Sequence, residues 1–493
     1  MFRTRTRRTR TPLTAIATLA LVAAVLAGCG GSGSPGGSAG PQLGPAAVRA
    51  ALAAEVQRDI AAAWPKMTEV WTGSDHGRRV LILAGAPGEG AEVIDVAGVT
   101  RATAADLARA RIEVPPSGYA KATWRGRAAV VMAGPDPVIA AEAMRVPGAR
   151  AATSRLIATA ATRESFRLYD QRPGTDRAWP ALSDTAEEHL GHGAPLPPSA
   201  APRLYRASLI NALRLAWLEP ERRPHHLAAA AYWQGRWADG SPEEYAAARH
   251  LDLLEGVGGY VQTASALLMP HSGNPRTYKK QLAYDAFAHR TGPADPDAES
   301  REIGGLACLI MAEQEGAGEE VEGWQEQLVE SGTTPAELLL DEIEPAGQRE
   351  DTELARRVAE ETAAERTVLA RTVDPMLKAY RDRTTTLLLV PSTALRGPFL
   401  AGGQHIGPEG SPRQIYGGVQ AAYETSSGAV EFTGRPAFED TVDSKRYLVV
   451  PIDPADPATR LTGRHLVLAA PRLAGSLDVT ATTRNGRRLL IAR

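Results

Sequence analysis

Two arginines and a glutamate share one turn of a predicted helix, in the segment Arg163-Glu-Ser-Phe-Arg167. Residues 163 and 167 are four positions apart, so both guanidinium groups project from one face of a helix, with Glu164 beside the first. A guanidinium is permanently protonated and has no lone pair to give to a metal, so it favours a carboxylate instead. That carboxylate could come from Glu164, from Glu255 or from a ligand. The alternative is a solvated helix face with a simple i,i+3 ion pair.

The segment resembles the active-site helix of gluzincin-type zinc metallopeptidases, in which His-Glu-x-x-His supplies two zinc ligands and a general base. Glu164 and Phe166 stand where that family has its glutamate and an apolar residue, while Arg163 and Arg167 stand at the two histidine positions. The resemblance implies that Glu164 would be the base of an active enzyme. It also implies that the two arginines mark a site that has lost its metal.

A second segment, Leu253-Leu-Glu-Gly-Val-Gly-Gly-Tyr-Val261, is similar to the downstream helix of the same family. In gluzincins a glutamate on that helix is the third zinc ligand, and the matching residue here is Glu255. Together the two segments extend the resemblance over about residues 46 to 345. They imply a mainly helical, zincin-like domain in which an internal Arg–Glu cluster replaces the metal, so no cofactor is expected.

Histidines elsewhere in the chain leave a metal-dependent alternative open. His189 and His192 have a His-x-x-His spacing beside two acids, and His225, His226 and His250 are further candidates. Under this alternative the protein is an active peptidase, with Glu164 as base and zinc held by some of His189, His192 and Glu255. Cys308 lies in an apolar run and is expected to be a buried, unreactive thiol.

The N-terminus predicts export and lipid anchoring. Five arginines precede an apolar stretch from Leu13 to Gly28, which is too short to be a typical membrane-spanning helix. The stretch ends in Leu26-Ala-Gly-Cys29, which resembles the lipobox of bacterial lipoproteins. In that family the cysteine is lipidated and the leader is removed before it. The resemblance therefore implies that Cys29 anchors the protein to the lipid bilayer at the extracytoplasmic face of the cell membrane.

Composition limits the partners. The whole chain has 55 basic and 57 acidic residues, and removing the five arginines of the leader leaves 50 basic residues and a net charge near −7. An exported, mildly acidic protein is a poor candidate for nucleic-acid binding. The abundance of Ala, Arg, Gly and Pro is typical of a GC-rich actinobacterial genome.

Four regions follow from these patterns. Residues 1–28 are the signal peptide, and residues 29–45 are the lipidated Cys29 and a flexible Gly/Ser/Pro tether. Residues 46–384 form the mainly helical domain, because apolar residues recur every three to four positions. Residues 385–493 form a small β-rich region of five or six strands, separated by Gly, Pro and Asp turns. Helices clustered first and strands clustered last predict an α+β fold.

Individual elements are expected within these regions. Val48, Leu52, Val56 and Ile60 predict the core face of a first helix that ends at Trp64-Pro65. The other expected helices are 154–168, 203–218, 242–269, 301–313, 321–330 and 353–380, with a break in the third at Gly256 or at Gly258-Gly259 as an option. The candidate core residues of the last helix are Leu354, Val358, Val368, Leu369, Val373 and Leu377. Expected strands are 80–83 and 128–132, then 385–390, 428–433, 446–451, 464–468, 477–482 and 488–491.

The favoured function is that of a membrane-anchored lipoprotein that binds or scaffolds a protein or peptide partner without catalysis. An active metal-dependent peptidase is the first alternative. A solute-binding lipoprotein is the second, although such proteins have two similar lobes of alternating strands and helices, and this sequence has no such pair.

Overall fold

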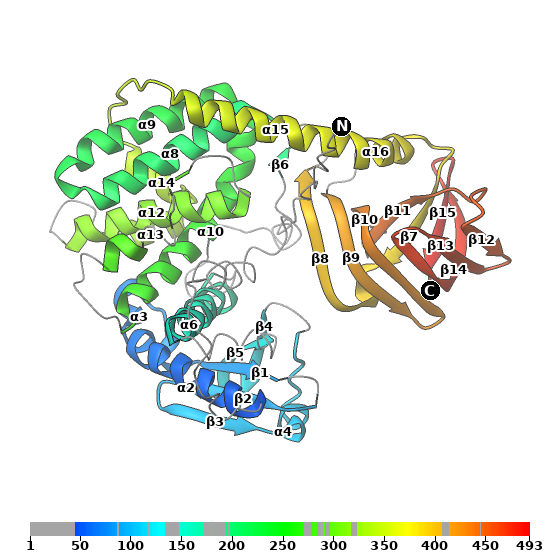
Figure 1. Ribbon diagram of the computed structural model, residues 1–493, viewed down its shortest axis with the longest axis horizontal. Coiled ribbons are helices and arrows are strands. Elements are labelled where there is room, and N and C mark those ends of the chain that lie inside the picture. The colour runs from blue at the N-terminus through cyan, green and yellow to red at the C-terminus, as the bar shows by residue number, and fades with distance from the viewer. Residues whose placement is uncertain are drawn as a thin grey trace, which may run out of the picture. The chain divides into compact units, whose positions relative to one another are not determined.

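The computed structural model describes most of the chain after its N-terminal region (Figure 1). The described residues are 45–85, 88–115, 119–133, 147–171, 179, 194–195, 198–270, 278–282, 287, 289–290, 296–316, 323–406, 414–443 and 445–493. Helices and strands are both abundant in these ranges, so the fold is of mixed α and β type. The predicted signal peptide, Cys29, most of the predicted tether, His189 and His192 lie outside the described residues.

The chain divides into two compact units. The first, which we call the helical unit, is Ala39–Arg371 with Ile406–Pro408, and the second, the β unit, includes Thr372–His405 and Glu409–Arg493. The boundary expected between residues 384 and 385 falls within the β unit, since helix α16 (Asp374–Arg381) belongs to that unit.

The helical unit opens with helix α2 (Pro45–Ala63), whose predicted core residues Val48, Leu52, Val56 and Ile60 are all buried. The helix ends there and the short 3-10 turn η1 (Trp64–Lys66) follows, because Pro65 lacks the N–H that another helical turn needs. Two short elements, α3 (Met67–Val70) and η2 (His76–Arg78), lead to the sheet, and a third, α4 (Ala104–Arg109), follows its first three strands. The prediction for the first helix is confirmed.

A mixed five-stranded sheet follows, in the order β3-β2-β1-β5-β4. Its strands are β1 (Val80–Ala84), β2 (Ala91–Asp95), β3 (Gly98–Ala102), β4 (Tyr119–Trp124) and β5 (Arg127–Ala133). Only β1 and β5 pair in parallel, and both of these strands were predicted. The sheet is therefore larger than the sequence indicated, because β2, β3 and β4 were not predicted.

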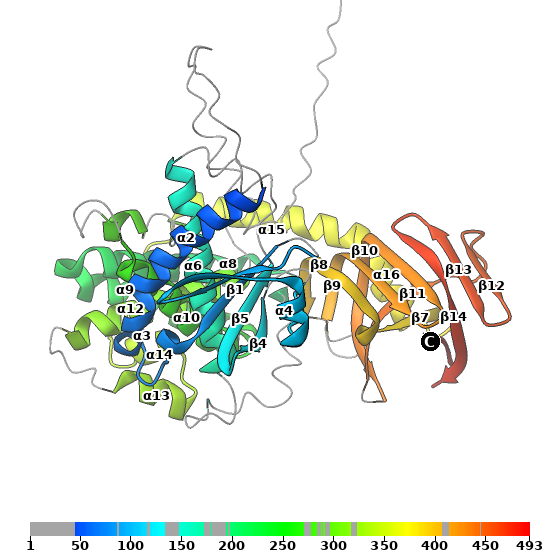
Figure 2. The same ribbon diagram turned by 90° about the horizontal axis from the view of Figure 1, so that it is seen from below.

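Helices cover both faces of this sheet. Leu81, Leu83 and Ile94 face α2 and α6 (Pro147–Tyr169), whereas Leu107 of α4 covers the residues of the opposite face. Figures 1 and 2 show α2 and α6 lying side by side. This packing fixes α6, which carries the Arg163–Arg167 segment, against the sheet.

The remaining helices of this unit build its larger layer. They are α8 (Ala200–Leu218), α9 (Arg223–Gly240), α10 (Pro242–Leu268), α12 (Pro296–Gly316), α13 (Trp324–Ser331), α14 (Pro335–Leu340) and α15 (Thr352–Thr372). Two short elements, β6 (Ala194–Pro195) and η3 (Pro220–Arg222), also fall in this part of the chain. Helix α10 continues without interruption through Gly256, Gly258 and Gly259, so the optional break is wrong. Its glycines serve as contact points for neighbouring elements.

The long helix expected over 353–380 is two helices, α15 and α16, which meet at Val373. Pro375 at the second position of α16 cannot donate the backbone hydrogen bond that a continuous helix would require there. Leu354, Val358, Leu369, Val373 and Leu377 are buried as expected, but Val368 is 53% exposed, so its place in the core was predicted wrongly.

The β unit contains more strands than expected, nine among the described residues rather than five or six. They are β7 (Thr386–Pro391), β8 (Leu395–Ile406), β9 (Gln414–Thr425), β10 (Gly428–Val442), β11 (Lys445–Ile452), β12 (Thr459–Thr462), β13 (His465–Ala470), β14 (Leu473–Arg484) and β15 (Arg487–Ala492), with a short turn η4 (Ser392–Ala394) after β7. Strand β14 pairs with both β15 and β10, so β14-β15-β7-β11-β10 closes into a ring. The ring encloses a core that includes Leu388, Phe432 and Leu490.

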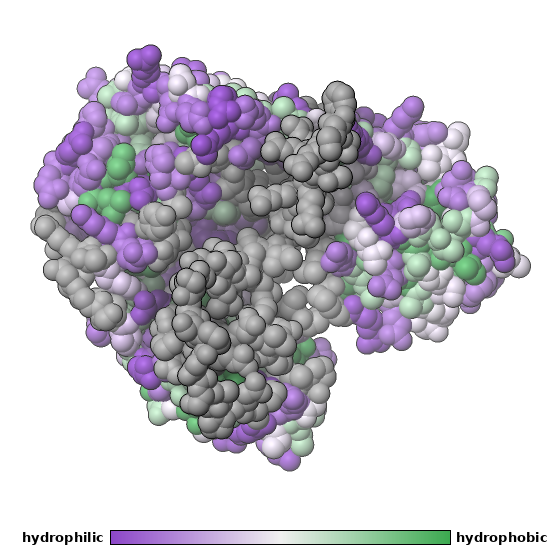
Figure 3. Space-filling view, viewed as in Figure 1, coloured by the Kyte–Doolittle hydropathy of each residue, from purple (hydrophilic) through white to green (hydrophobic). Residues whose placement is uncertain are grey.

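None of the described helices combines the length and the apolar character that crossing a bilayer requires. Figure 3 shows a largely hydrophilic face over α9 and α15, with scattered hydrophobic residues.

Candidate functional site

The Arg163–Arg167 segment lies near the end of α6 and has two different faces. Ser165 and Phe166 are fully buried on one of them. The Phe166 ring packs edge-on against Trp71, with ring centroids 5.3 Å apart, and Arg79 donates to the Ser165 carbonyl at 3.1 Å and to its hydroxyl at 3.0 Å. These contacts hold the buried face, so Arg163, Glu164 and Arg167 are presented on the other.

Helix α10 brings Glu255 to that second face. The Arg163 Nη2 lies 2.8 Å from Glu255 Oε2, and the Arg167 Nη2 lies 3.1 Å from Glu255 Oε1, so each carboxylate oxygen meets a different guanidinium. Glu164 lies 3.6 Å from Arg163 and 3.5 Å from Arg167. The Glu255 side chain is only 3% exposed. The four residues that the sequence singled out are therefore neighbours.

Helix α12 adds a fifth member, Arg301, whose Nη2 lies 3.9 Å from Glu255 Oε2. Burial and the nearby charge of Arg163 lower the pKa of Arg301. Burial also acts to lower the pKa of Arg167. The charges of Glu255 and Glu164 outweigh this effect and raise the pKa of its guanidinium. We call Arg163, Glu164, Arg167, Glu255 and Arg301 the Arg–Glu cluster.

Glycines make room for the cluster. A Cβ on Gly258 would lie 3.6 Å from Cγ of Arg163, and a Cβ on Gly259 would lie 2.5 Å from Cγ of Arg301. The alkyl stems of both arginines therefore cross α10 where it has no side chains. This explains the glycine-rich sequence that directly follows Glu255.

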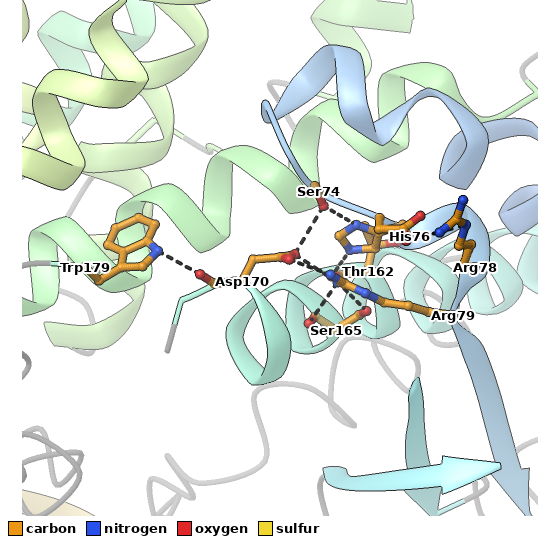
Figure 4. A network of polar contacts seen from close by, with 9 residues as sticks. Ser74, His76, Arg78, Arg79, Thr162, Ser165, Asp170 and Trp179 are labelled. Carbon is orange, nitrogen blue, oxygen red and sulfur yellow. Dashed lines mark hydrogen bonds and ion pairs between the residues drawn. The ribbon is translucent and has the colours of Figure 1, made fainter. Parts of the chain in front are cut away.

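A second polar network fastens the segment before β1 to the end of α6 (Figure 4). Arg79 donates to both carboxylate oxygens of Asp170, and Ser74 lies 3.1 Å from Asp170 Oδ2. The Ser74 hydroxyl also lies 2.6 Å from His76 Nδ1, while His76 Nε2 lies 3.0 Å from the Thr162 carbonyl. The network positions α6, and therefore the Arg–Glu cluster, relative to the sheet.

The chemistry of this network differs from that of a Ser-His-Asp triad. In a triad the histidine lies between the other two groups, so that it can accept the serine proton while the acid orients it. Here Ser74 lies between His76 and Asp170, and the far nitrogen of His76 faces a carbonyl. Burial lowers the pKa of His76 to about 3, helped by the charge of Arg79. The arrangement anchors the chain and does not form a nucleophile.

Sequence reasoning missed Arg79, Ser74, His76, Asp170 and Arg301. The contacts between Arg79 and Asp170 span 91 positions, and nothing in either local sequence marks them as partners. One feature of the sequence could have pointed to Arg301. The pair Gly304-Gly305 begins three residues later, and it marks a close contact with another helix.

The other candidate residues that the structure describes are three histidines and Cys308, and their surroundings suit a structural role. His226 is buried, with Nε2 3.1 Å from Glu219, and the His225 ring packs edge-on against it. His250 lies on α10, away from any grouping of ligands. Cys308 is fully buried, and burial raises the pKa of its thiol well above the usual value. This agrees with the unreactive thiol expected from the apolar run.

The donor set of the Arg–Glu cluster does not suit zinc. A site of the gluzincin type needs two imidazole nitrogens and one carboxylate, whereas three guanidinium groups here offer hydrogens and positive charge. Both oxygens of Glu255 are also engaged by arginines. Within the described ranges, no three His, Cys, Asp or Glu side chains are grouped as a metal site would require.

Comparison with protein-family models, with curated proteins and with solved structures finds no significant match.

Proposed function

We propose that this protein is a lipid-anchored, extracytoplasmic binding or scaffolding protein whose helical unit is zincin-like and works without a catalytic metal. The observation that carries the proposal is the bridging of Glu255 by Arg163 and Arg167 at 2.8 and 3.1 Å. In the gluzincin resemblance these three positions are the zinc ligands. An ion-pair cluster at the same place holds two helices together without Lewis acidity.

The surroundings of α6 support the zincin-like part of the proposal. The helix follows a mixed five-stranded sheet and packs on it, and the helix bearing Glu255 lies directly against α6. The matching positions are thus arranged as a pair of adjacent helices beside a sheet. The function then rests on non-covalent contacts with a protein or peptide partner, and anchoring through Cys29 keeps the body at the outer face of the membrane.

Zinc content tests the proposal directly. The full chain, purified without chelators, should carry far less than one zinc ion per chain by elemental mass spectrometry. Near-stoichiometric zinc that is lost when His189 and His192 are both replaced by alanine would contradict it and favour the active peptidase. Saturable binding of a small solute, detected as thermal stabilisation, would instead favour the solute-binding alternative.

A restored ligand set tests the zincin-like geometry separately. The double substitution Arg163→His and Arg167→His places two imidazoles beside Glu255, the His₂Glu set of a gluzincin. We expect the folded variant to take up about one zinc ion per chain. Adding Glu255→Gln should abolish this uptake. A folded double variant that binds no zinc would contradict the zincin-like arrangement, whatever the zinc content of the natural chain.

A further inference from the structure

A cavity of about 410 Å³ lies in the β unit, where the end of α16 meets the outer face of strands β7, β11 and β15. Its floor is apolar: Leu387, Leu389, Val449 and Leu489 are all buried. Leu389 is paired with Val449 across β7 and β11, and Leu387 is paired with Leu489 across β7 and β15. Their chain neighbours Leu388, Leu448 and Leu490 belong to the core inside the ring.

The walls of the cavity are strongly basic. Four arginines, at positions 381, 383, 484 and 487, line it together with a single acid, Asp440. That acid is already engaged, since its Oδ2 accepts a hydrogen bond of 2.7 Å from the Tyr380 hydroxyl. The cavity therefore has an excess of positive charge that its own carboxylate does not offset.

Two of these arginines have partners within the protein and two are available. Arg487 donates to the Tyr380 carbonyl and its guanidinium carbon lies 5.0 Å from the Tyr380 ring centroid, yet its buried Nε has no hydrogen-bond partner. Arg484 pairs with Asp443 at 3.0 Å. Arg381 and Arg383 have no acidic partner among the described residues and are exposed.

We propose that this cavity binds a small organic anion, with a phosphate or carboxylate head at the arginines and an apolar part on the leucine and valine floor. Guanidinium groups match such oxyanions with paired hydrogen bonds, and a desolvated apolar floor favours an attached hydrocarbon. The cavity volume lies within the range of about 300–1,000 Å³ common for small-molecule sites. The head group could belong to a membrane lipid or to a free metabolite.

Titration calorimetry on the full chain in a non-ionic detergent tests the site, with hexyl phosphate, hexanoate and inorganic phosphate as probes. We expect one hexyl anion to bind per chain, more tightly than inorganic phosphate because its chain covers the floor. Replacing Arg381 and Arg383 together by glutamine should weaken this binding about tenfold or more, through the lost charged hydrogen bonds.

A second pair of substitutions controls for the change in net charge. Arg460→Gln with Arg464→Gln removes two exposed arginines of the same unit outside the cavity and should leave binding within about twofold of the natural chain. Absence of saturable binding for both hexyl probes, or equal weakening by the two pairs, would overturn the proposal. Competition by phosphatidylglycerol, added as mixed micelles in the same detergent, identifies a lipid head group as the source, and its absence with hexyl anions still bound identifies a free anion.

Discussion

Gly256 of α10 and Gly304 of α12 touch backbone to backbone: a Cβ built on Gly256 would lie 2.5 Å from the Cα of Gly304. No side chain fits between the helices at this crossing. Glu255 lies next to the contact, and Arg301 lies one turn before Gly304. The close approach therefore brings members of the Arg–Glu cluster from the two helices within reach of each other.

The first prediction is that Gly256→Ala destabilises the helical unit. The added methyl group must push α12 away, because the atoms that it meets are backbone atoms that cannot rotate aside. We expect a loss of about 1–3 kcal/mol in the free energy of unfolding, measured by urea denaturation. The control is Gly235→Ala on α9, where nothing lies within 4 Å and the substitution should raise stability by about 0.5–1 kcal/mol. Equal effects at the two positions would contradict the close contact.

The second prediction concerns the charge on Glu255. Glu255→Gln keeps the shape of the side chain but leaves Arg163 and Arg167 without their shared, buried carboxylate. Because breaking a buried pair leaves uncompensated charge, we expect a loss of about 3–5 kcal/mol in the free energy of unfolding. Glu353 also pairs with two arginines, but at the surface of α15. Glu353→Gln should change the unfolding midpoint far less, and a comparable shift would show that the cluster is effectively solvated.

The local elements could be predicted from the sequence where hydrophobic periodicity is strong. The four-residue spacing from Val48 to Ile60 gave α2, and the apolar run from Val80 gave β1. Strands β3 and β4 were missed because Gly98–Ala102 and Tyr119–Trp124 are mostly polar or small and lie at the edges of their sheet. Such segments become strands through pairing with a neighbour, which no local pattern reveals.

The candidate site, like the fold, could be predicted from the sequence only in part. The residue types and spacing of Arg163, Glu164 and Arg167 placed them on one helix face, and the resemblance pointed to Glu255 as their partner. The sequence could not show that Gly258 and Gly259 leave space for arginine stems, since this depends on how α6, α10 and α12 cross. Val368 fails for a related reason: its position in the apolar pattern of α15 is suitable, but its side chain is 53% exposed.

The third prediction is a pH dependence from His76. Burial holds the pKa of His76 at about 3 in the folded state, below its ordinary value of 6.5. The unfolded chain therefore takes up a proton that the folded chain does not, so this contribution to stability is present above pH 6.5 and is lost as the pH falls toward 3. His76→Gln should reduce the slope of stability against pH in that window, by up to about 1.4 kcal/mol per pH unit. Urea denaturation at several pH values between 3 and 7 measures this slope, and an unchanged slope in the His76→Gln variant would contradict the prediction.

The fourth prediction tests anchoring. Cys29→Ala removes the thiol that lipidation requires, so the variant should leave the membrane fraction or remain unprocessed. Cell fractionation followed by mass spectrometry of the N-terminus measures both results. Cys308→Ala is the matched control, because it removes the other cysteine and should leave the protein in the membrane fraction. Unchanged retention of the Cys29→Ala variant would contradict the lipobox assignment.

The last prediction counts free thiols. Cys308 is fully buried on α12, and burial raises the pKa of its thiol, so neither access nor ionisation favours reaction. The native chain should therefore give no rapid reaction with a disulfide reagent, although it has a free cysteine. In denaturant the membrane-derived protein should give one thiol per chain, since lipidation removes Cys29 from the count of two cysteines. Two thiols after denaturation would mean that Cys29 is unmodified, and a rapid reaction in the native state would mean that α12 opens at Cys308.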